Sequence, residues 1–386
     1  MQHLLTDAQQ GRYAEFRRFV GASVEPFAQD WEREQALPEA IVAAMAKAGY
    51  LGATLPDDYG GRAWDVVTFG LLNEAFGRGS SSLTSVLTVQ AMVSMAIVKW
   101  GTAPQRQTWL PRLASGETLA AIALTEPGAG SNLQALTTSF HRRAGGDVLV
   151  LSGSKCWITC GQLAKLFLVF GKLAGQPVAC LVPSNARGVV VDPIRDLMGF
   201  RAVGLARLRF EDVEVSLGDV VGKAGFAFSH VAPVALHYGR ISTACSALGL
   251  LRACFEESVA YAAQRKIGDR ALGEFGMIRS LIARMGTELQ AASLLCVSAC
   301  RSEDERAAEA FEDALAAKYF TSRAAVQAAS DAVQIRGASG CHDSSPTSRY
   351  YGAAKIMEII EGTTQIHEDL LGQIYLGRRG GLGALS

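Results

Sequence analysis

The segment Asp147-Val148-Leu149-Val150-Leu151-Ser152-Gly153, followed by Lys155-Cys156-Trp157-Ile158-Thr159, interrupts a chain that is otherwise helical in pattern. Apolar and β-branched residues bounded by Ser and Gly are typical of strands, so this segment predicts two short strands and a turn. Short apolar runs continue to about residue 220, and residues 206–215 alternate apolar with polar side chains. No strand–helix–strand alternation accompanies them, which disfavours a doubly wound parallel sheet and favours a small antiparallel β-barrel or sandwich.

Helical spacing precedes and follows this β-region. Leu37, Ile41 and Met45 recur every four residues in the first block, and long Ala-rich stretches without a strict heptad follow Gly225. We therefore expect an α+β fold in three parts. These are an N-terminal α-helical domain over residues 1–120, a β-domain over 121–224 and a C-terminal helical bundle over 225–386.

The composition excludes several classes of protein. The 386 residues carry 37 Lys+Arg and 37 Asp+Glu, and this balance argues against partners such as nucleic acid or an anionic membrane surface. With 49% hydrophobic and 19% charged residues, disorder is excluded for most of the chain. No apolar run reaches the roughly 18–20 residues of a membrane span, and no secretion signal is visible. We expect a cytoplasmic protein with reduced thiols, and no metal, because its Cys and His residues lack ligand spacing.

Several loops could bind a ligand, although the common Gly-rich nucleotide motifs are absent. The loop at residues 123–132 offers backbone N–H groups and hydroxyls to a heterocycle edge or a phosphate. Trp157 could stack on an aromatic cofactor while Thr159 binds its polar edge. A third loop, residues 334–340, is a Gly-containing break between long helices. Taken singly, a surface turn and an ordinary core Trp are the more common explanations of the first two features.

The fourth segment, Ile359-Ile360-Glu361-Gly362-Thr363-Thr364-Gln365-Ile366, sets a carboxylate among isoleucines. Desolvation by apolar neighbours disfavours the charged form and makes Glu361 a stronger proton acceptor toward a weak carbon acid. The alternatives are a capping Glu and half of a surface ion pair, and Glu358 is the local rival.

In their order and spacing, these four segments resemble those of the acyl-CoA dehydrogenase flavoprotein family. The motifs are T-E-P-x-A-G-S, W-I-T, Q-x-x-G-x-x-G and E-G-T-x-Q, and the similarity covers essentially the whole chain. The resemblance implies that the C-terminal part is a four-helix bundle and that FAD is the cofactor. It also implies an FAD site completed by a second subunit, and hence a homodimer or homotetramer.

By resemblance, Glu361 is the general base that removes the pro-R α-proton of an acyl thioester while hydride passes to flavin N5, giving an enoyl thioester. A minority of the family carries the base just before a matching Arg, here Arg240, where this chain has Gly239. Both residues are expected at the substrate. The residues implied in FAD binding are Leu124, Thr125, Gly130, Ser131, Trp157, Thr159, Arg265, Gln334, Gly337, Thr363 and Gln365.

The resemblance leaves the thioester carrier open between CoA and a carrier protein. Some similar enzymes oxidise carrier-bound acyl groups in polyketide or nonribosomal biosynthesis, and the segment around Gly239-Arg240 is most similar to theirs. Electron-transfer flavoprotein or another acceptor is expected as a partner. Two alternative functions remain at this point: a flavin-dependent oxidase or hydroxylase on the same fold, and a non-catalytic helical scaffold.

Overall fold

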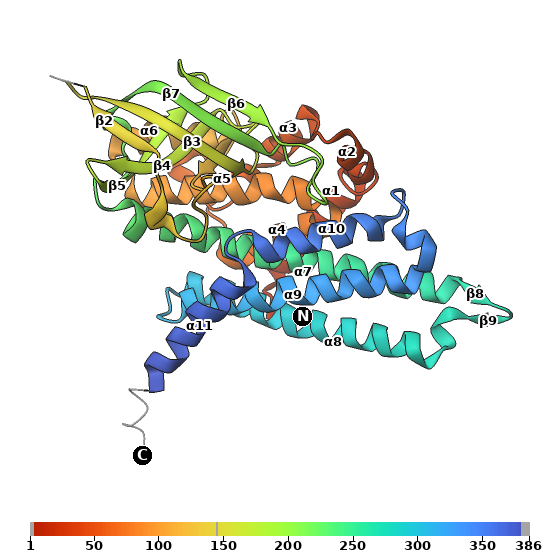
Figure 1. The fold of residues 1–386 in the computed structure, drawn as a ribbon. Helices are drawn as coiled ribbons and strands as arrows, with labels where there is room; N and C mark the ends of the chain where they lie inside the picture. Colours follow the sequence, from red (N-terminus) through yellow and green to blue (C-terminus); the bar gives the residue numbers. More distant parts are fainter. Residues whose placement is uncertain (1–3, 144–145, 380–386) are drawn as a thin grey trace.

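The computed structural model describes residues 4–143 and 146–379, in which helices precede and follow one large sheet (Figure 1). Polar side chains start the helices: Asp65 accepts a hydrogen bond from the Thr68 N–H at 2.6 Å, and Ser80 accepts one from the Leu83 N–H at 3.2 Å. The N-terminal helices are α1 (Asp7–Ser23), α2 (Ala28–Glu34), α3 (Glu39–Ala48), α4 (Val66–Gly79), α5 (Ser81–Trp100) and α6 (Ala103–Ser115).

The sheet has seven strands. Six of them follow the order β1-β4-β2-β3-β7-β6, in which β1 and β2 pair with opposite ends of β4, and the seventh, β5, pairs with β4 along its whole length. The sheet is mixed, because β1 and β2 both pair with β4 in parallel, so the expectation of a wholly antiparallel sheet was wrong. The two strands predicted at 147–159 form one continuous strand. The strands are β1 (Ala120–Ala123), β2 (Ser139–Arg142), β3 (Val148–Ile158), β4 (Leu166–Leu173), β5 (Gln176–Pro183), β6 (Val189–Pro193) and β7 (Ala206–Ser216).

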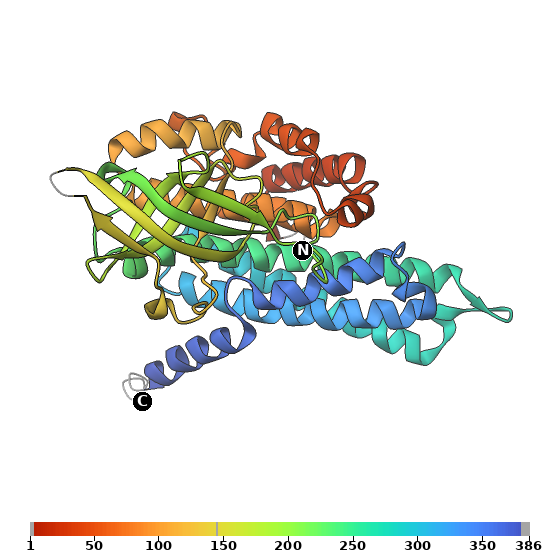
Figure 2. The ribbon, with the colours of Figure 1, turned by 45° about the horizontal axis from the view of Figure 1, so that its top comes forward.

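The C-terminal part is helical, as predicted, and its first four helices run beside one another while the last projects away from them (Figures 1 and 2). A short hairpin, β8 (Lys266–Ile267) and β9 (Arg270–Ala271), joins the first two helices at the end far from the large sheet. The helices are α7 (Ala232–Gln264), α8 (Gly276–Asp304), α9 (Ala310–Arg336), α10 (Pro346–Ile359) and α11 (Thr364–Arg379).

Helix α5 lies at the centre of the molecule and packs against both α7 and the sheet region. By length and composition it could cross a membrane, but 94% of its most apolar window is buried inside the fold, which is typical of a core helix. The predicted three-part α+β class is confirmed. The predicted boundary between residues 120 and 121 falls after the first residue of β1, and the one between residues 224 and 225 lies in the connection from β7 to α7. Both remain predictions of where the domains begin and end.

Candidate active site

A strained turn between α10 and α11 presents Glu361. Glu361 has a φ of 55° and Gly362 a φ of 102°, so two consecutive residues adopt the left-handed region. For a residue with a side chain this conformation costs about 1–3 kcal/mol. The Thr363 hydroxyl then accepts a hydrogen bond from the Ile366 N–H at 3.4 Å at the start of α11. The turn therefore fixes the direction of the Glu361 side chain.

The Glu361 carboxylate lies against the junction of α5 and α7. A Cβ placed on Gly239 would be 2.4 Å from Glu361 Oε2 and 3.0 Å from the sulfur of Met92 on α5. Only a glycine leaves room for the carboxylate at this point of α7. The structure thus brings together Glu361 and Gly239, which lie 122 positions apart (361 − 239) in the sequence.

The acid–base properties of Glu361 follow from burial and two cations. Its Oε2 atom is buried and has no hydrogen-bond partner among the residues that the structure describes. Burial raises the pKa of Glu361 to about 7, although the positive charges of Arg240 and Lys318 oppose the shift. A carboxylate with its pKa raised in this way is able to accept a proton near neutral pH.

Arg240, which follows Gly239 on α7, is nearly fully buried. Its Nε has no hydrogen-bond partner within the described ranges, and its guanidinium lies 5.3 Å from the ring centroid of Phe311. Burial lowers the pKa of Arg240, and the nearby Glu361 charge counteracts that effect. The interaction of Arg240 with Glu361 is thus electrostatic.

Lys318 on α9 and His367 on α11 belong to this site and were missed by the sequence analysis. The fully buried Lys318 donates hydrogen bonds to the carbonyl oxygens of Gly362 at 2.6 Å and Glu358 at 3.2 Å, and burial lowers its pKa to about 8. Burial likewise lowers the pKa of His367 to about 3, so its ring is neutral. One signal was available: Lys318 occupies the helical spacing of buried Ala314 and Leu315.

The rival carboxylate, Glu358, is engaged in other contacts. It accepts hydrogen bonds from Lys355 at 2.6 Å and from the Thr364 hydroxyl at 2.9 Å. Burial would raise the pKa of Glu358, but these two donors outweigh burial and lower it. Glu358 is therefore an ion-paired structural residue, and the unpaired Glu361 is the better base.

A second group of predicted residues lies at the sheet, where a buried ion pair joins the loop after β1 to strand β3. Lys155 on β3 donates to Glu126 at 2.8 Å and to the carbonyl oxygen of Leu124 at 3.1 Å. Glu126 also accepts hydrogen bonds from Thr137 and Thr138, and although burial alone would raise its pKa, these donors and Lys155 lower it to about 2. The sequence alone indicated no role for Glu126 or Lys155.

This ion pair places the two predicted ligand-binding segments side by side. The Cys156 N–H donates to the carbonyl oxygen of Thr125 at 3.0 Å, which joins the loop after β1 to the end of β3. Leu124, Thr125 and Thr159 are partly buried, whereas Gly130 and Ser131 of the same loop are exposed.

The side chain of Trp157 is 58% exposed, so the explanation as an ordinary core Trp was wrong. The pairing of β3 with β7 shifts register between Lys155 and Ile158, and Trp157 has a φ of 59° at this bulge. The bulge turns a large aromatic face outward next to backbone and hydroxyl groups. Such a surface fits a flat heterocyclic ligand such as the ring system of FAD.

A third group does not join Glu361 within one chain. Arg265 lies just before β8, and Gln334 and Gly337 lie where α9 ends, at the end of the bundle far from the sheet (Figure 1). All three are exposed. Thr363 lies two residues after Glu361, and Gln365 is exposed in the first turn of α11.

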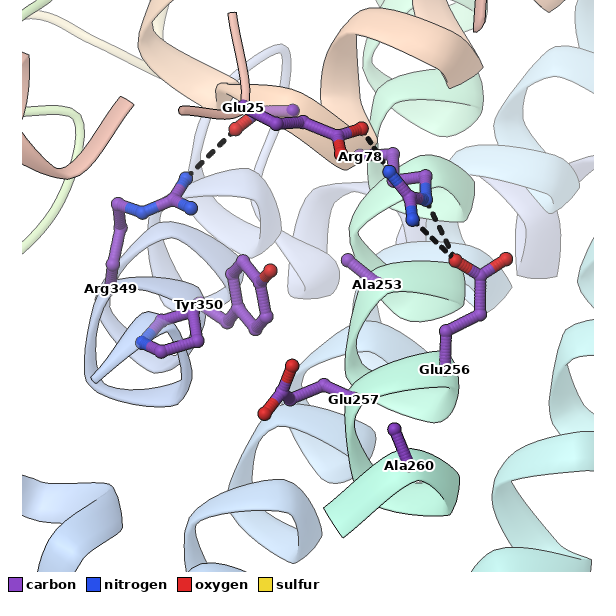
Figure 3. A pocket seen from close by; sticks show the side chains of 10 residues that line it. Glu25, Arg78, Ala253, Glu256, Glu257, Ala260, Arg349 and Tyr350 are labelled. Carbon is purple, nitrogen blue, oxygen red and sulfur yellow. Dashed lines mark hydrogen bonds and ion pairs between the residues drawn. The ribbon is translucent and has the colours of Figure 1, made fainter. Parts of the chain in front are cut away.

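A hollow of about 350 Å³ lies elsewhere, between the N-terminal helices and the bundle (Figure 3). Its charged groups are engaged in contacts: Arg78 pairs with Glu25 and with Glu256, the latter at 2.7 Å, Glu257 pairs with Arg336 outside the hollow, and Arg349 donates to the carbonyl oxygen of Gly79 at 3.0 Å. These contacts join α4, α7 and α10, and none of the residues that line the hollow belongs to the Glu361 group.

Comparison with known protein families assigns all three parts of the chain. Residues 6–117 match the acyl-CoA dehydrogenase N-terminal domain, residues 121–213 its middle domain and residues 229–376 its C-terminal domain. An acyl-CoA dehydrogenase of Bacillus subtilis (strain 168) is 33% identical over 367 residues, which covers 94% of this chain and 96% of that protein.

Solved structures agree with this assignment. Butyryl-CoA dehydrogenase from Megasphaera elsdenii superimposes with a TM-score of 0.92 at 28% identity, covering 96% of this chain and 99% of the other. FkbI, described as serving biosynthesis of the methoxymalonyl extender unit of the polyketide Fk520, gives a TM-score of 0.85 at 31% identity, covering 95% and 99%.

Proposed function

The chain belongs to the acyl-CoA dehydrogenase family, and we propose from that premise that Glu361 is the base with which it oxidises an acyl thioester. It is an FAD-dependent oxidoreductase that acts on a CH–CH bond and yields an enoyl thioester. The observation that carries the proposal is the buried Oε2 of Glu361, which is unpaired among the described residues and belongs to a carboxyl whose pKa is about 7.

FAD, when bound, supplies the acceptor for the hydride that leaves the β-carbon. The exposed indole of Trp157 and the adjacent groups of Thr125 and Thr159 fit such a ligand, and the Glu126–Lys155 ion pair holds their two segments in place. Glu361 Oε2 accepts the α-proton. Burial keeps water away from this oxygen, while Arg240 and Lys318 stabilise its anionic form enough for it to be populated at neutral pH.

The decisive experiment compares Glu361→Gln with the wild-type enzyme in anaerobic flavin reduction by an acyl thioester. A general base contributes about 10²–10⁴-fold, so we expect a loss of that size at unchanged FAD content. Glu358→Gln, three residues earlier, is the matched control and should retain most of the rate. Equal reduction rates for Glu361→Gln and wild type would refute the assignment.

Three further features of the function are proposals of the same kind. The exposed positions of Arg265, Gln334 and Gly337, remote from Glu361, support a homodimer or homotetramer in which they reach a neighbouring subunit's FAD. The seven buried free cysteines fit a reducing cytoplasm. Electron-transfer flavoprotein is the proposed electron acceptor, and slow flavin reoxidation by air would distinguish this dehydrogenase from an oxidase.

The thioester carrier is tested with two matched substrates. Similarity to acyl-CoA and butyryl-CoA dehydrogenases supports CoA, and similarity to FkbI supports a role in biosynthesis of a polyketide extender unit. A carrier protein is the alternative carrier that we propose for such a role. The same acyl group is presented on each carrier, and the higher kcat/KM for flavin reduction identifies the natural one.

A further inference from the structure

The residues around Glu361 determine the direction in which the acyl chain of a substrate can extend from the carboxylate. Arg240 and Lys318 act on the carboxylate as charged groups, whereas a Cβ at Gly239 would meet both the carboxylate and the sulfur of Met92 at the α5–α7 junction. We take the α-carbon of the acyl group to lie next to Oε2 of Glu361. The rest of the acyl chain then stays away from the charged groups of Arg240 and Lys318 if it extends along the α5–α7 junction. The residues one turn after Gly239 on α7 and one turn before Met92 on α5 therefore determine which tails fit.

One helical turn beyond Gly239 and Met92, hydrogen bonds close the junction. Thr88 Oγ1 on α5 lies 2.6 Å from Ser242 Oγ on α7, and Ser242 donates to Asn73 Oδ1 on α4 at 2.7 Å. All three side chains are at most 7% exposed. Since three residues of a helix rise about 4.5 Å, roughly three carbon–carbon bonds separate the level of the base from this bridge.

The closed end of this junction is polar and not fully satisfied. Ser242 donates a hydrogen bond to Asn73, and Thr88 Oγ1 donates to the carbonyl oxygen of Thr84 at 3.3 Å, so both hydroxyls of the bridge have further partners. Thr243 lies four residues after Gly239 and therefore on the same face of α7. It is 2% exposed, and its hydroxyl has no hydrogen-bond partner in the described part of the chain. A hydrocarbon tail would leave that hydroxyl unpaired, whereas a tail with a polar end could pair with it.

We propose that the enzyme acts on short acyl thioesters, of about four carbons, whose far end carries a hydrogen-bonding group such as a hydroxyl or an amide. Thr88, Ser242 and Asn73 limit the length, and Thr243 recognises the polar end. This proposal rests on Glu361 being the base, because it takes the carboxylate as the point from which the tail is measured.

The test uses anaerobic flavin reduction by three pantetheine thioesters: 4-hydroxybutyryl, its near-isostere valeryl, and octanoyl. Pantetheine is the part that CoA and carrier proteins share, so the result does not depend on the carrier. For the wild-type enzyme we expect kcat/KM for 4-hydroxybutyryl to exceed that for valeryl about tenfold or more, and that for octanoyl to be about 100-fold below valeryl.

Two variants separate the two parts of the proposal. Thr243→Val should reduce the preference for the hydroxyl to within about twofold, because kcat/KM for 4-hydroxybutyryl falls toward that for valeryl. Ser242→Ala should open the bridge and raise octanoyl relative to valeryl. Ser258→Ala is the matched control, because its hydroxyl is also buried and unpaired among the described residues of α7 but lies 19 positions (258 − 239) beyond Gly239.

The outcomes are distinguishable. Equal wild-type rates with valeryl and octanoyl, or no preference for the hydroxyl, would overturn this proposal and leave the dehydrogenase function intact. Flavin reduction by none of the three thioesters would overturn the proposed base and this inference together.

Discussion

Adding one methyl group at Gly239 should disable the base without harming the fold. In Gly239→Ala the new Cβ would lie 2.4 Å from Glu361 Oε2 and 2.8 Å from Cδ, whereas ordinary van der Waals contact begins at 3.4 Å. The carboxylate must therefore move by about 1 Å. It can do so, because it is the end of a flexible side chain, but a displacement of this size costs about 100-fold in rate, or about 2.7 kcal/mol of barrier.

Stability should change in the opposite direction, because Ala favours a helix interior over Gly by roughly 0.5–1 kcal/mol. The assay is the rate of anaerobic flavin reduction in a single turnover, with the melting temperature measured in parallel. Gly11→Ala on α1 is the control, since nothing lies within 4 Å of its added Cβ, and it should keep the full rate. A wild-type rate for Gly239→Ala would refute the placement of the Glu361 carboxylate against α7.

Three further substitutions test the electrostatics and the ligand-binding segments. Lys318→Met removes a cation that lowers the pKa of Glu361, so the midpoint near pH 7 at which kcat/KM rises should move up by about one to two units; an unchanged or more acidic midpoint in the pH profile would contradict this. Lys155→Met breaks a buried ion pair and should lower the free energy of unfolding by about 3–5 kcal/mol in urea titrations, whereas the exposed Lys165→Met should cost under about 1 kcal/mol. Trp157→Ala should weaken FAD binding about tenfold in fluorescence titrations and leave the melting temperature of the FAD-free protein unchanged, because the indole is 58% exposed; tight FAD binding by this variant would show that the indole does not contact the cofactor.

The three-part fold was predictable because it depends on local periodicity. The spacing of Leu37, Ile41 and Met45 anticipated α3, and the alternation over residues 206–215 anticipated β7. Strand order was not predictable in the same way. The parallel pairing of β1 and β2 with β4 depends on a crossover that side-chain alternation does not encode, which is why the sheet was expected to be antiparallel.

The site shows the same division between local and distant causes. The isoleucines before Glu361 predicted an apolar setting, and burial does raise its pKa. Ile359 is 52% exposed, however, and the carboxylate lies against Gly239 on α7, so the burial comes from tertiary packing. The exposure of Trp157 could not be anticipated, since it follows from a bulge created by the pairing of β3 with β7. Lys318 lies 43 positions (361 − 318) before Glu361, on another helix, so only the packing of α9 against α10 and α11 places its charge near the base.

The arrangement of charge around Glu361 explains how a buried carboxylate can remain an effective base. Burial alone would leave it protonated at neutral pH, whereas a hydrogen-bonded ion pair would lower its pKa and weaken it as a proton acceptor. Lys318 avoids the second outcome, because it donates its hydrogen bonds to the carbonyl oxygens of Gly362 and Glu358. Its charge, with that of Arg240, acts on the carboxylate through space and leaves Oε2 without a donor among the described residues. The pKa near 7 is thus the balance between burial and two cations, and the oxygen that must take the α-proton stays available.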